Sequence, residues 1–177
     1  RIYCFTPGGG SKGPTVEPDF ARAPAQDVSA RRILSQVDAE EGYCLAVGNV
    51  DAGLLNGLAE GSDLTIYTPA DDGEADLLRR TLDRAGLYGP RVAVHICPTD
   101  PLPYADYFAD LVVCNVQSEK DLEELSATEL YRVTRPYGGR LVVAFADGLE
   151  RAVRRWLGRA ESVREQAAHK WELGVYS

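Results

Sequence analysis

The chain has 177 residues, of which 45% are hydrophobic and 26% are charged, a composition typical of one folded domain with a full hydrophobic core. Its formal net charge of −8 makes nucleic acid an unfavourable partner, because an acidic surface repels phosphate groups. No apolar run approaches the roughly 18 residues that a membrane-spanning helix needs. We therefore expect neither a nucleic-acid partner nor a membrane span.

The N-terminal part differs in composition from the rest. The chain begins at Arg1 and contains no methionine, so we expect it to be part of a longer protein. Residues 1–5 (RIYCF) indicate a short strand, and residues 6–26, with their many prolines and glycines, indicate a linker arm. We therefore divide the chain into a strand end with a linker, 1–26, and a folded domain, 27–177.

The first half of the domain predicts helices and strands in alternation. Apolar residues recur with helical spacing in three segments, and an aspartate stands near the start of each. The apolar run YCLAV, bounded by glycines, is typical of a strand buried on both faces. The predicted elements are a helix at 27–37, a strand at 43–47, a helix at 51–60, a strand at 63–67 and a helix at 71–85.

The second half continues this alternation. A proline-rich turn, CPTDPLP, separates the first two strands, and a pair of glycines precedes the third. The predicted elements are strands at 91–96 and 109–116, a helix at 119–133, a strand at 140–145, a helix at 148–160 and two short strands within 162–177, of which 170–176 is the clearer.

Strands that alternate with helices predict a parallel sheet covered on both faces. In such sheets, ligands bind beyond the carboxyl ends of the strands, at the point where the strand order reverses. The turns at 48–53, 67–72, 97–103 and 114–118 are therefore the expected walls of a binding site.

The four cysteines do not form a metal-site pattern. Cys4, Cys44, Cys97 and Cys114 include no Cys-x-x-Cys pair, and the chain has only two histidines. Two of these cysteines stand inside apolar runs, which indicates small buried thiols. We predict no metal site.

Five segments in this order resemble a class I S-adenosylmethionine-dependent methyltransferase domain. They are 43-YCLAVGNVDAGLL-55, 64-LTIYTPADD-72, 86-GLYGPRVAVH-95, 101-PLPYADYFADLVVCN-115 and 130-LYRVTRPYGGRLVV-143. The last is similar to the family's motif ahead of its fifth strand, and the resemblance covers about residues 28–177. It implies an α/β, doubly wound, mostly parallel seven-stranded sheet (a Rossmann-like fold) with a C-terminal antiparallel hairpin.

A narrower resemblance concerns the context of the domain. Together with 86-GLYG-89, the chain is similar to methyltransferase-like domains embedded in bacterial proteins that carry β-propeller repeats of the pyrroloquinoline-quinone type. Residues 1–5 resemble the last strand of such a repeat. The resemblance implies a longer parent chain, with a β-propeller as the partner of this domain.

The family resemblance also implies how S-adenosylmethionine is held. A Gly-x-Gly-x-Gly turn follows the first strand, and here Gly48 matches the first glycine whereas Val50 and Ala52 stand at the other two positions. Added Cβ atoms restrict a turn that needs room and positive φ angles. The cofactor contacts implied by the family are Gly48, Asn49, Asp51, Gly53, Asp71, Asp100 and Asn115.

Two acids of the family pattern are displaced in this chain. Pro69 falls at the position of the acid that binds the ribose hydroxyls, and Asp71 follows two residues later. Pro98 falls at the position of the acid that contacts the adenine, and Asp100 follows two residues later. Losing one charge-assisted hydrogen bond costs about 1.5–3 kcal/mol, or roughly tenfold to a hundredfold in affinity. Asp71 and Asp100 compensate only if their loops bend inward.

Several of these residues have alternative interpretations. Asp51 and Asp71 are well placed as helix N-caps, and an aspartate is common in a turn such as the one at Asp100. His95 is either a general base or a histidine near a strand end. The tyrosines of 104-YADY-107 either line a substrate mouth or pack over the sheet.

The sequence therefore predicts a methyltransferase fold whose cofactor site is eroded, with weak or no methyl transfer. The alternatives are an active S-adenosylmethionine-dependent methyltransferase of unknown acceptor, or a non-catalytic interaction module of a β-propeller protein. A dinucleotide-binding domain is disfavoured, because the chain lacks the third glycine of Gly-x-Gly-x-x-Gly and has a threonine at position 68 where an acid is expected.

Overall fold

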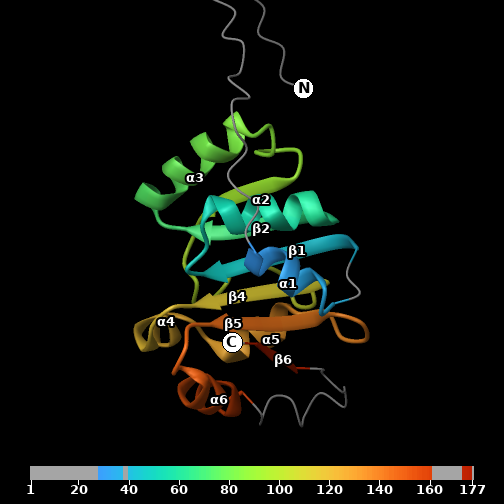
Figure 1. Cartoon of the computed structure of the whole chain (residues 1–177). Coiled ribbons are helices and arrows are strands. Elements are labelled where there is room, and N and C mark those ends of the chain that lie inside the picture. The colour runs from blue at the N-terminus through green and yellow to red at the C-terminus, as the bar shows by residue number, and fades with distance from the viewer. Residues whose placement is uncertain (1–27, 38–39, 161–172, 177) are drawn as a thin grey trace, which may run out of the picture.

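The computed structural model describes residues 28–37, 40–160 and 173–176 (Figure 1). Six strands form one sheet in the order β3-β2-β1-β4-β5-β6, and every neighbouring pair is parallel. The strands are β1 (Glu41–Gly48), β2 (Asp63–Ala70), β3 (Val92–Ile96), β4 (Leu111–Val116), β5 (Arg140–Phe145) and β6 (Leu173–Tyr176). The helices are α1 (Val28–Leu34), α2 (Ala52–Gly61), α3 (Asp72–Arg84), α4 (Glu119–Glu124), α5 (Ala127–Val133) and α6 (Glu150–Gly158).

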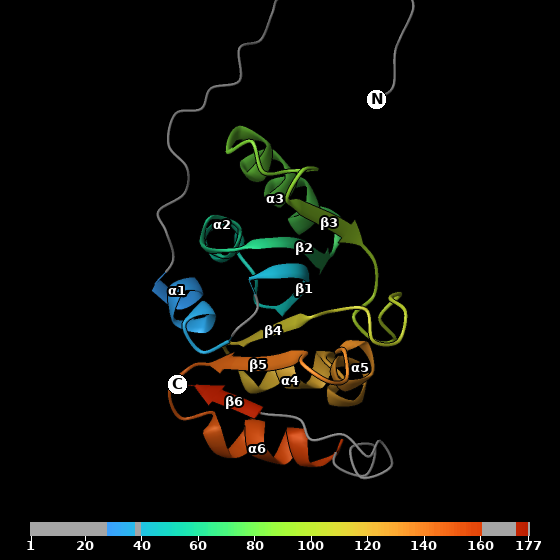
Figure 2. The same ribbon diagram turned by 90° about the vertical axis from the view of Figure 1, so that its right-hand side faces the viewer.

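Helices cover the two faces of the sheet in two groups (Figure 2). Successive side chains of a strand point to opposite faces, so β1 contributes Cys44 and Ala46 to the core beside α1, α2 and α3, and Leu45 and Val47 to the core beside α4, α5 and α6. The sequence YCLAV is apolar throughout because both faces are buried. None of the helices in the described residues is long and apolar enough to cross a membrane.

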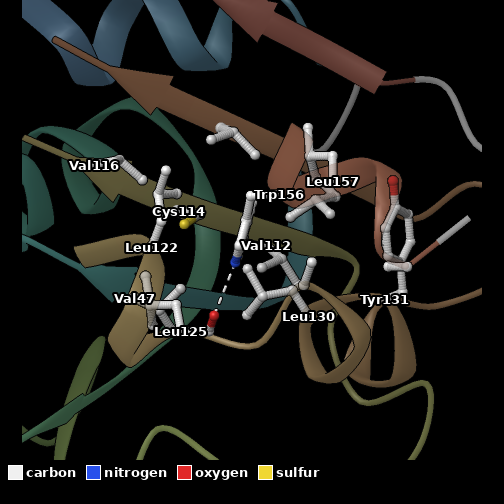
Figure 3. Close-up of a cluster of buried hydrophobic side chains, with 14 of the residues drawn as sticks. Val47, Val112, Cys114, Val116, Leu122, Leu125, Leu130, Tyr131, Trp156 and Leu157 are labelled. Atoms are coloured by element: carbon white, nitrogen blue, oxygen red, sulfur yellow. Dashed lines mark hydrogen bonds between the residues drawn. The ribbon is translucent and has the colours of Figure 1, made fainter. Parts of the chain in front are cut away.

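The core beside α4, α5 and α6 is anchored by Trp156 (Figure 3). Its indole is 4% exposed, and Nε1 donates a hydrogen bond of 2.9 Å to the carbonyl oxygen of Leu125. This contact joins α6 to the end of α4 and satisfies both polar groups inside an apolar cluster. Burying each large apolar side chain here stabilises the fold by about 1.5–3 kcal/mol.

The connection between β3 and β4, residues 97–110, contains no helix. Aromatic side chains cover β2 and β3 instead, on the face opposite α2 and α3. Phe108 stacks on Tyr43 and on Tyr104, with ring centroids 5.3 Å and 5.0 Å apart. Tyr104 in turn stacks on His95 and approaches Tyr67 edge-on. Tyr104 therefore packs over the sheet, one of its two expected roles.

Arg132 of α5 holds this connection in place. Its guanidinium donates to the carbonyl oxygens of Leu102 and Tyr104, at 2.9 Å and 2.8 Å. It also pairs with Asp106 and, through two nitrogens, with Glu129. Glu129 accepts the backbone N–H of Leu102 as well. A planar guanidinium can make all these contacts at once, and they tie α5 to the connection at several points.

Two predictions of secondary structure differ from the described structure. The single helix predicted at 119–133 is two helices, because Leu125 is extended and the Ser126 side chain caps α5. The sheet has six described strands, and its last strand, β6, runs parallel to β5 rather than in an antiparallel hairpin. Most of the other expected arm of that hairpin lies outside the described residues, as do the strand and linker predicted within 1–26.

A candidate ligand site at the carboxyl edge of the sheet

A pocket of about 370 Å³ lies beyond the carboxyl ends of β1, β2 and β3. Small-molecule sites typically have volumes of about 300–1,000 Å³. Three of the four turns expected to form the site contribute to it, and α4 supplies the last wall in place of residues 114–118. The lining residues are Gly48 and Asn49 after β1; Pro69, Ala70, Asp71 and Glu74 at β2 and α3; Cys97, Pro98 and Thr99 after β3; and Asp121, Glu124 and Leu125 at α4.

Gly48 is required by the packing of β1 against β4. Its φ angle is +85°, and a side chain there would collide with the backbone oxygen of Asn115. The backbone N–H of Asn49 donates to that oxygen at 2.8 Å, and the Asn115 side-chain amide donates to the Asn49 carbonyl at 2.6 Å. The fold alone therefore accounts for this glycine, whether or not a ligand binds beside it. Asn115 itself does not line the pocket.

Val50 and Ala52, which stand where two glycines were expected, pack against the core beside α1, α2 and α3. Neither belongs to the pocket wall. The Val50 N–H donates to the Gly48 carbonyl at 2.8 Å, which closes the turn tightly. These two side chains therefore leave the space beyond β1 unfilled. Gly53 is half-buried in the first turn of α2, also away from the wall.

The two aspartates that begin helices have different surroundings. Asp51 caps α2 by accepting the Leu54 N–H at 2.8 Å, and it does not line the pocket. Asp71 is the first residue after β2; it caps α3 by accepting the Glu74 N–H at 2.9 Å, and it lines the pocket. Both contacts use one carboxylate oxygen, Oδ1. Asp71 thus acts as a helix cap and is also placed to meet a ligand.

The two prolines of the displaced pattern both line the pocket, whereas Asp100 does not. Pro69 is buried in β2 and pairs in register with His95 of β3. Asp100 is exposed and precedes Pro101 through a cis peptide bond. The loop after β3 therefore does not bring Asp100 into the wall.

Sequence reasoning missed the contribution of α4 and of Glu74. Asp121 forms a capping box with Ser118: it accepts the Ser118 hydroxyl at 2.7 Å and the backbone N–H groups of Gln117 and Ser118. Burial raises the pKa of Asp121, but these hydrogen bonds outweigh burial and lower the pKa below its usual value. The Ser-x-x-Asp spacing at 118–121 was a readable signal for this helix start.

The charge of the lining is one-sided. Asp71, Glu74, Asp121 and Glu124 line the pocket, and among the described residues no lysine, arginine or histidine does. Glu124 is paired directly with a cation, Lys120, at 3.0 Å. Within the described part of the chain, neither Asp71 nor Glu74 forms an ion pair.

The described cysteines are free thiols. Burial raises the pKa of Cys44 and of Cys114 to about 12, so both remain protonated at neutral pH. Cys97 lines the pocket and is half-buried; burial raises its pKa, and a hydrogen bond with Tyr104 acts in the opposite direction. In the ranges that the structure describes, no group of three or more His, Cys, Asp or Glu side chains is arranged to hold a metal ion.

No family model and no curated protein matches the sequence. Among solved structures, a geranyl diphosphate C-methyltransferase from Streptomyces coelicolor, bound to S-adenosylhomocysteine, is similar with a TM-score of 0.61 and 15% identity, over 76% of this chain and 58% of that one. A protein from Methanococcus maripaludis, provisionally assigned as an S-adenosylmethionine-dependent methyltransferase, gives a TM-score of 0.58 and 22% identity over 77% of this chain and 62% of that one.

The cyclase SpnF is also similar, with a TM-score of 0.56 and 20% identity over 72% of this chain and 55% of that one. It is named for cyclisation rather than for methyl transfer. The chain spans about three fifths of the length of the solved structures it matches. At these identities the likeness concerns architecture: the chain has the Rossmann-like fold of class I S-adenosylmethionine-dependent methyltransferases.

Proposed function

We propose that the domain binds S-adenosylmethionine weakly in the pocket beside Gly48 and that its cofactor site is eroded, so that methyl transfer is slow or absent. The observation that carries the proposal is the position of Asp71. It directly follows β2 and lines the pocket, where the fold family uses an acid for the ribose, yet one of its oxygens already caps α3.

The pocket has parts that suit each portion of the cofactor. Gly48 and Asn49 would lie beside the methionine portion, and Asp71 beside the ribose hydroxyls. Buried Leu125 and the ring of Pro98 would supply apolar contact for the adenine. When bound, the cofactor supplies an electrophilic methyl group. This chain would contribute by positioning it, since methyl transfer depends chiefly on alignment of donor and acceptor.

The same pocket explains why binding is expected to be weak. Pro98 provides no carboxylate where the family has the acid that contacts the adenine, and Asp71, which would meet the ribose, already uses one oxygen to cap α3. Each missing charge-assisted hydrogen bond lowers affinity by roughly tenfold to a hundredfold. A total loss of about 100- to 1,000-fold lies within the range for one or two such bonds, and it would raise the dissociation constant of a site from about 1 µM to about 0.1–1 mM.

Replacing Asp71 by serine tests this assignment without removing the helix cap, because serine is also a good N-cap residue. We expect Asp71→Ser to unfold at nearly the wild-type temperature and to bind S-adenosylmethionine about tenfold more weakly, by isothermal titration calorimetry. Asp83→Ser, which removes the same charge from the other end of α3, is the matched control and should bind like the wild type. Unchanged binding by Asp71→Ser would count against this site.

Cys97 offers a second measurement on the unmodified sequence. It lines the pocket, so bound S-adenosylmethionine should slow its alkylation by iodoacetamide, read by peptide mass spectrometry. Equal rates with and without millimolar cofactor would place any binding elsewhere.

A second candidate function is a non-catalytic interaction module within a longer β-propeller protein. The observation that favours it is the aromatic face over β2 and β3, where Tyr43 is 47% exposed and the neighbouring Tyr107 is 52% exposed. If the longer protein covers this face, hydrogen exchange at the start of β1 should be slower there than in the isolated domain. Equal exchange in the two would remove the support for this candidate.

A further inference from the structure

The charge of the pocket has a consequence for which ligand it selects. Four carboxylates line it, and no basic side chain of residues 28–37, 40–160 or 173–176 does. They stand in a cavity of about 370 Å³ at the carboxyl edge of the sheet, where open α/β sheets bind their ligands.

Two helix N-termini near this edge would ordinarily favour an anionic ligand, because unpaired N–H groups and the helix dipole attract negative charge. In this chain a carboxylate caps each of them. Asp51 accepts the Leu54 N–H at α2, and Asp71 accepts the Glu74 N–H at α3. The partial positive charge of each helix end is thus offset by the protein itself, and little attraction remains for the carboxylate of a methionine group.

The four carboxylates are not equally available to a ligand. Asp121 uses both oxygens within its capping box, and Glu124 is paired with Lys120. Glu74 takes part in no ion pair within the described residues, and Asp71 keeps Oδ2 beyond its cap. The uncompensated negative charge is therefore concentrated at the start of α3.

We propose that the pocket selects adenosyl ligands by positive charge, and so binds the sulfonium S-adenosylmethionine more tightly than the neutral thioether S-adenosylhomocysteine. This inference rests on the proposed function, since it concerns the same pocket. It also extends to a third ligand: decarboxylated S-adenosylmethionine, which has lost its only negative group, should bind at least as tightly as S-adenosylmethionine.

The experiment is a titration of the three ligands, whose net charges are 0, +1 and +2, into the same chain at low salt. We expect affinity to rise by roughly three- to tenfold between the neutral ligand and S-adenosylmethionine, the size of effect that one solvated charge contact contributes. Raising the ionic strength to 0.5 M should reduce the differences in affinity among the three ligands, because salt screens exposed carboxylates.

Glu74→Gln should reduce the ratio of affinities for S-adenosylmethionine and S-adenosylhomocysteine while leaving the affinity for the neutral ligand nearly unchanged. Asp83→Asn, which removes one exposed charge from the other end of α3, should keep the wild-type ratio. If all three ligands bind but S-adenosylhomocysteine binds as tightly as S-adenosylmethionine or more tightly, the selection by charge is wrong and the proposed function stands. Failure of all three to bind would instead overturn the proposed function.

Discussion

In the described structure, helices cover both faces of the sheet at β1, β4 and β5, whereas at β2 and β3 they cover one face only. The other face of β2 and β3 is covered by aromatic side chains from the helix-free connection 97–110. The same connection supplies Cys97, Pro98 and Thr99 to the pocket wall. The pocket lies between the two halves, because β1 and α4 supply the rest of its lining, and one of its walls therefore depends on how this connection is held.

The largest expected effect lies in the helix-covered half. Leu45 is fully buried between β1 and the helices α4, α5 and α6. Leu45→Ala should lower the free energy of unfolding by about 2–5 kcal/mol, because it removes buried methyl groups and leaves a cavity. Urea denaturation measures this. A loss smaller than that of Phe108→Leu would contradict the proposed difference between the halves.

A smaller effect is expected where the two halves are joined, at Arg132. Arg132→Lys keeps the positive charge but cannot reach two carbonyls and two carboxylates together. We expect a loss of about 1–3 kcal/mol in unfolding free energy and faster hydrogen exchange at the Leu102 amide.

The matched control is Arg154→Lys. Arg154 pairs with Glu150 at the exposed surface of α6, and such pairs contribute about 0–1 kcal/mol. Similar losses for the two variants would mean that the guanidinium geometry of Arg132 is unimportant.

The aromatic face should respond more weakly still. Phe108→Leu retains much of the apolar area but loses ring stacking on Tyr43 and Tyr104. We expect the free energy of unfolding to fall by about 0.5–1.5 kcal/mol, which is what aromatic pairs contribute beyond their buried area. Tyr107→Leu, at a half-exposed neighbour that stacks on no ring in the described part of the chain, should lose less stability. Thermal unfolding of the two variants, measured side by side, would show whether ring stacking on the aromatic face stabilises β2 and β3.

The smallest expected effect is a pH dependence at Glu129. A hydrogen bond from Arg132, opposed in part by burial, holds its pKa below the ordinary value of 4.5. A carboxyl group whose pKa is lower in the folded state stabilises the fold above the unfolded pKa, and that stabilisation is lost as pH falls through the folded pKa. The stability difference between wild type and Glu129→Gln should therefore shrink as pH is lowered below about 4.5. A stability difference between the two proteins that grows as pH falls would contradict this prediction.

Two strands of the helix-covered half were predictable from sequence. Residues 44–47 and 111–114 are apolar because both faces of the sheet are buried there, and the strands predicted at 43–47 and 109–116 lie within two residues of the observed ones. The strand 64–67 alternates instead, with Leu64 and Ile66 buried and Tyr67 in the aromatic row. That alternation indicates that the two faces of the strand have different surroundings. It does not predict which residues cover the aromatic face, because Tyr104 and Phe108 come from a loop with no periodic pattern.

The candidate site was predicted in part. Gly48, Asn49 and Asp71 do line the pocket, because turns after parallel strands converge at one edge of a sheet. Alignment by position put Pro69 at the ribose acid; β2 ends at Ala70, and both Pro69 and Asp71 line the pocket. The wall formed by α4 depends on the break at Leu125, which tertiary packing determines together with the Ser126 cap.

The central claim is that this pocket still binds S-adenosylmethionine, but weakly. Isothermal titration of the wild-type chain with S-adenosylmethionine tests it most directly. We expect saturable heat with one site and a dissociation constant of about 0.1–1 mM. Absence of heat and of any thermal shift at several millimolar ligand, or binding tighter than about 1 µM, would contradict it.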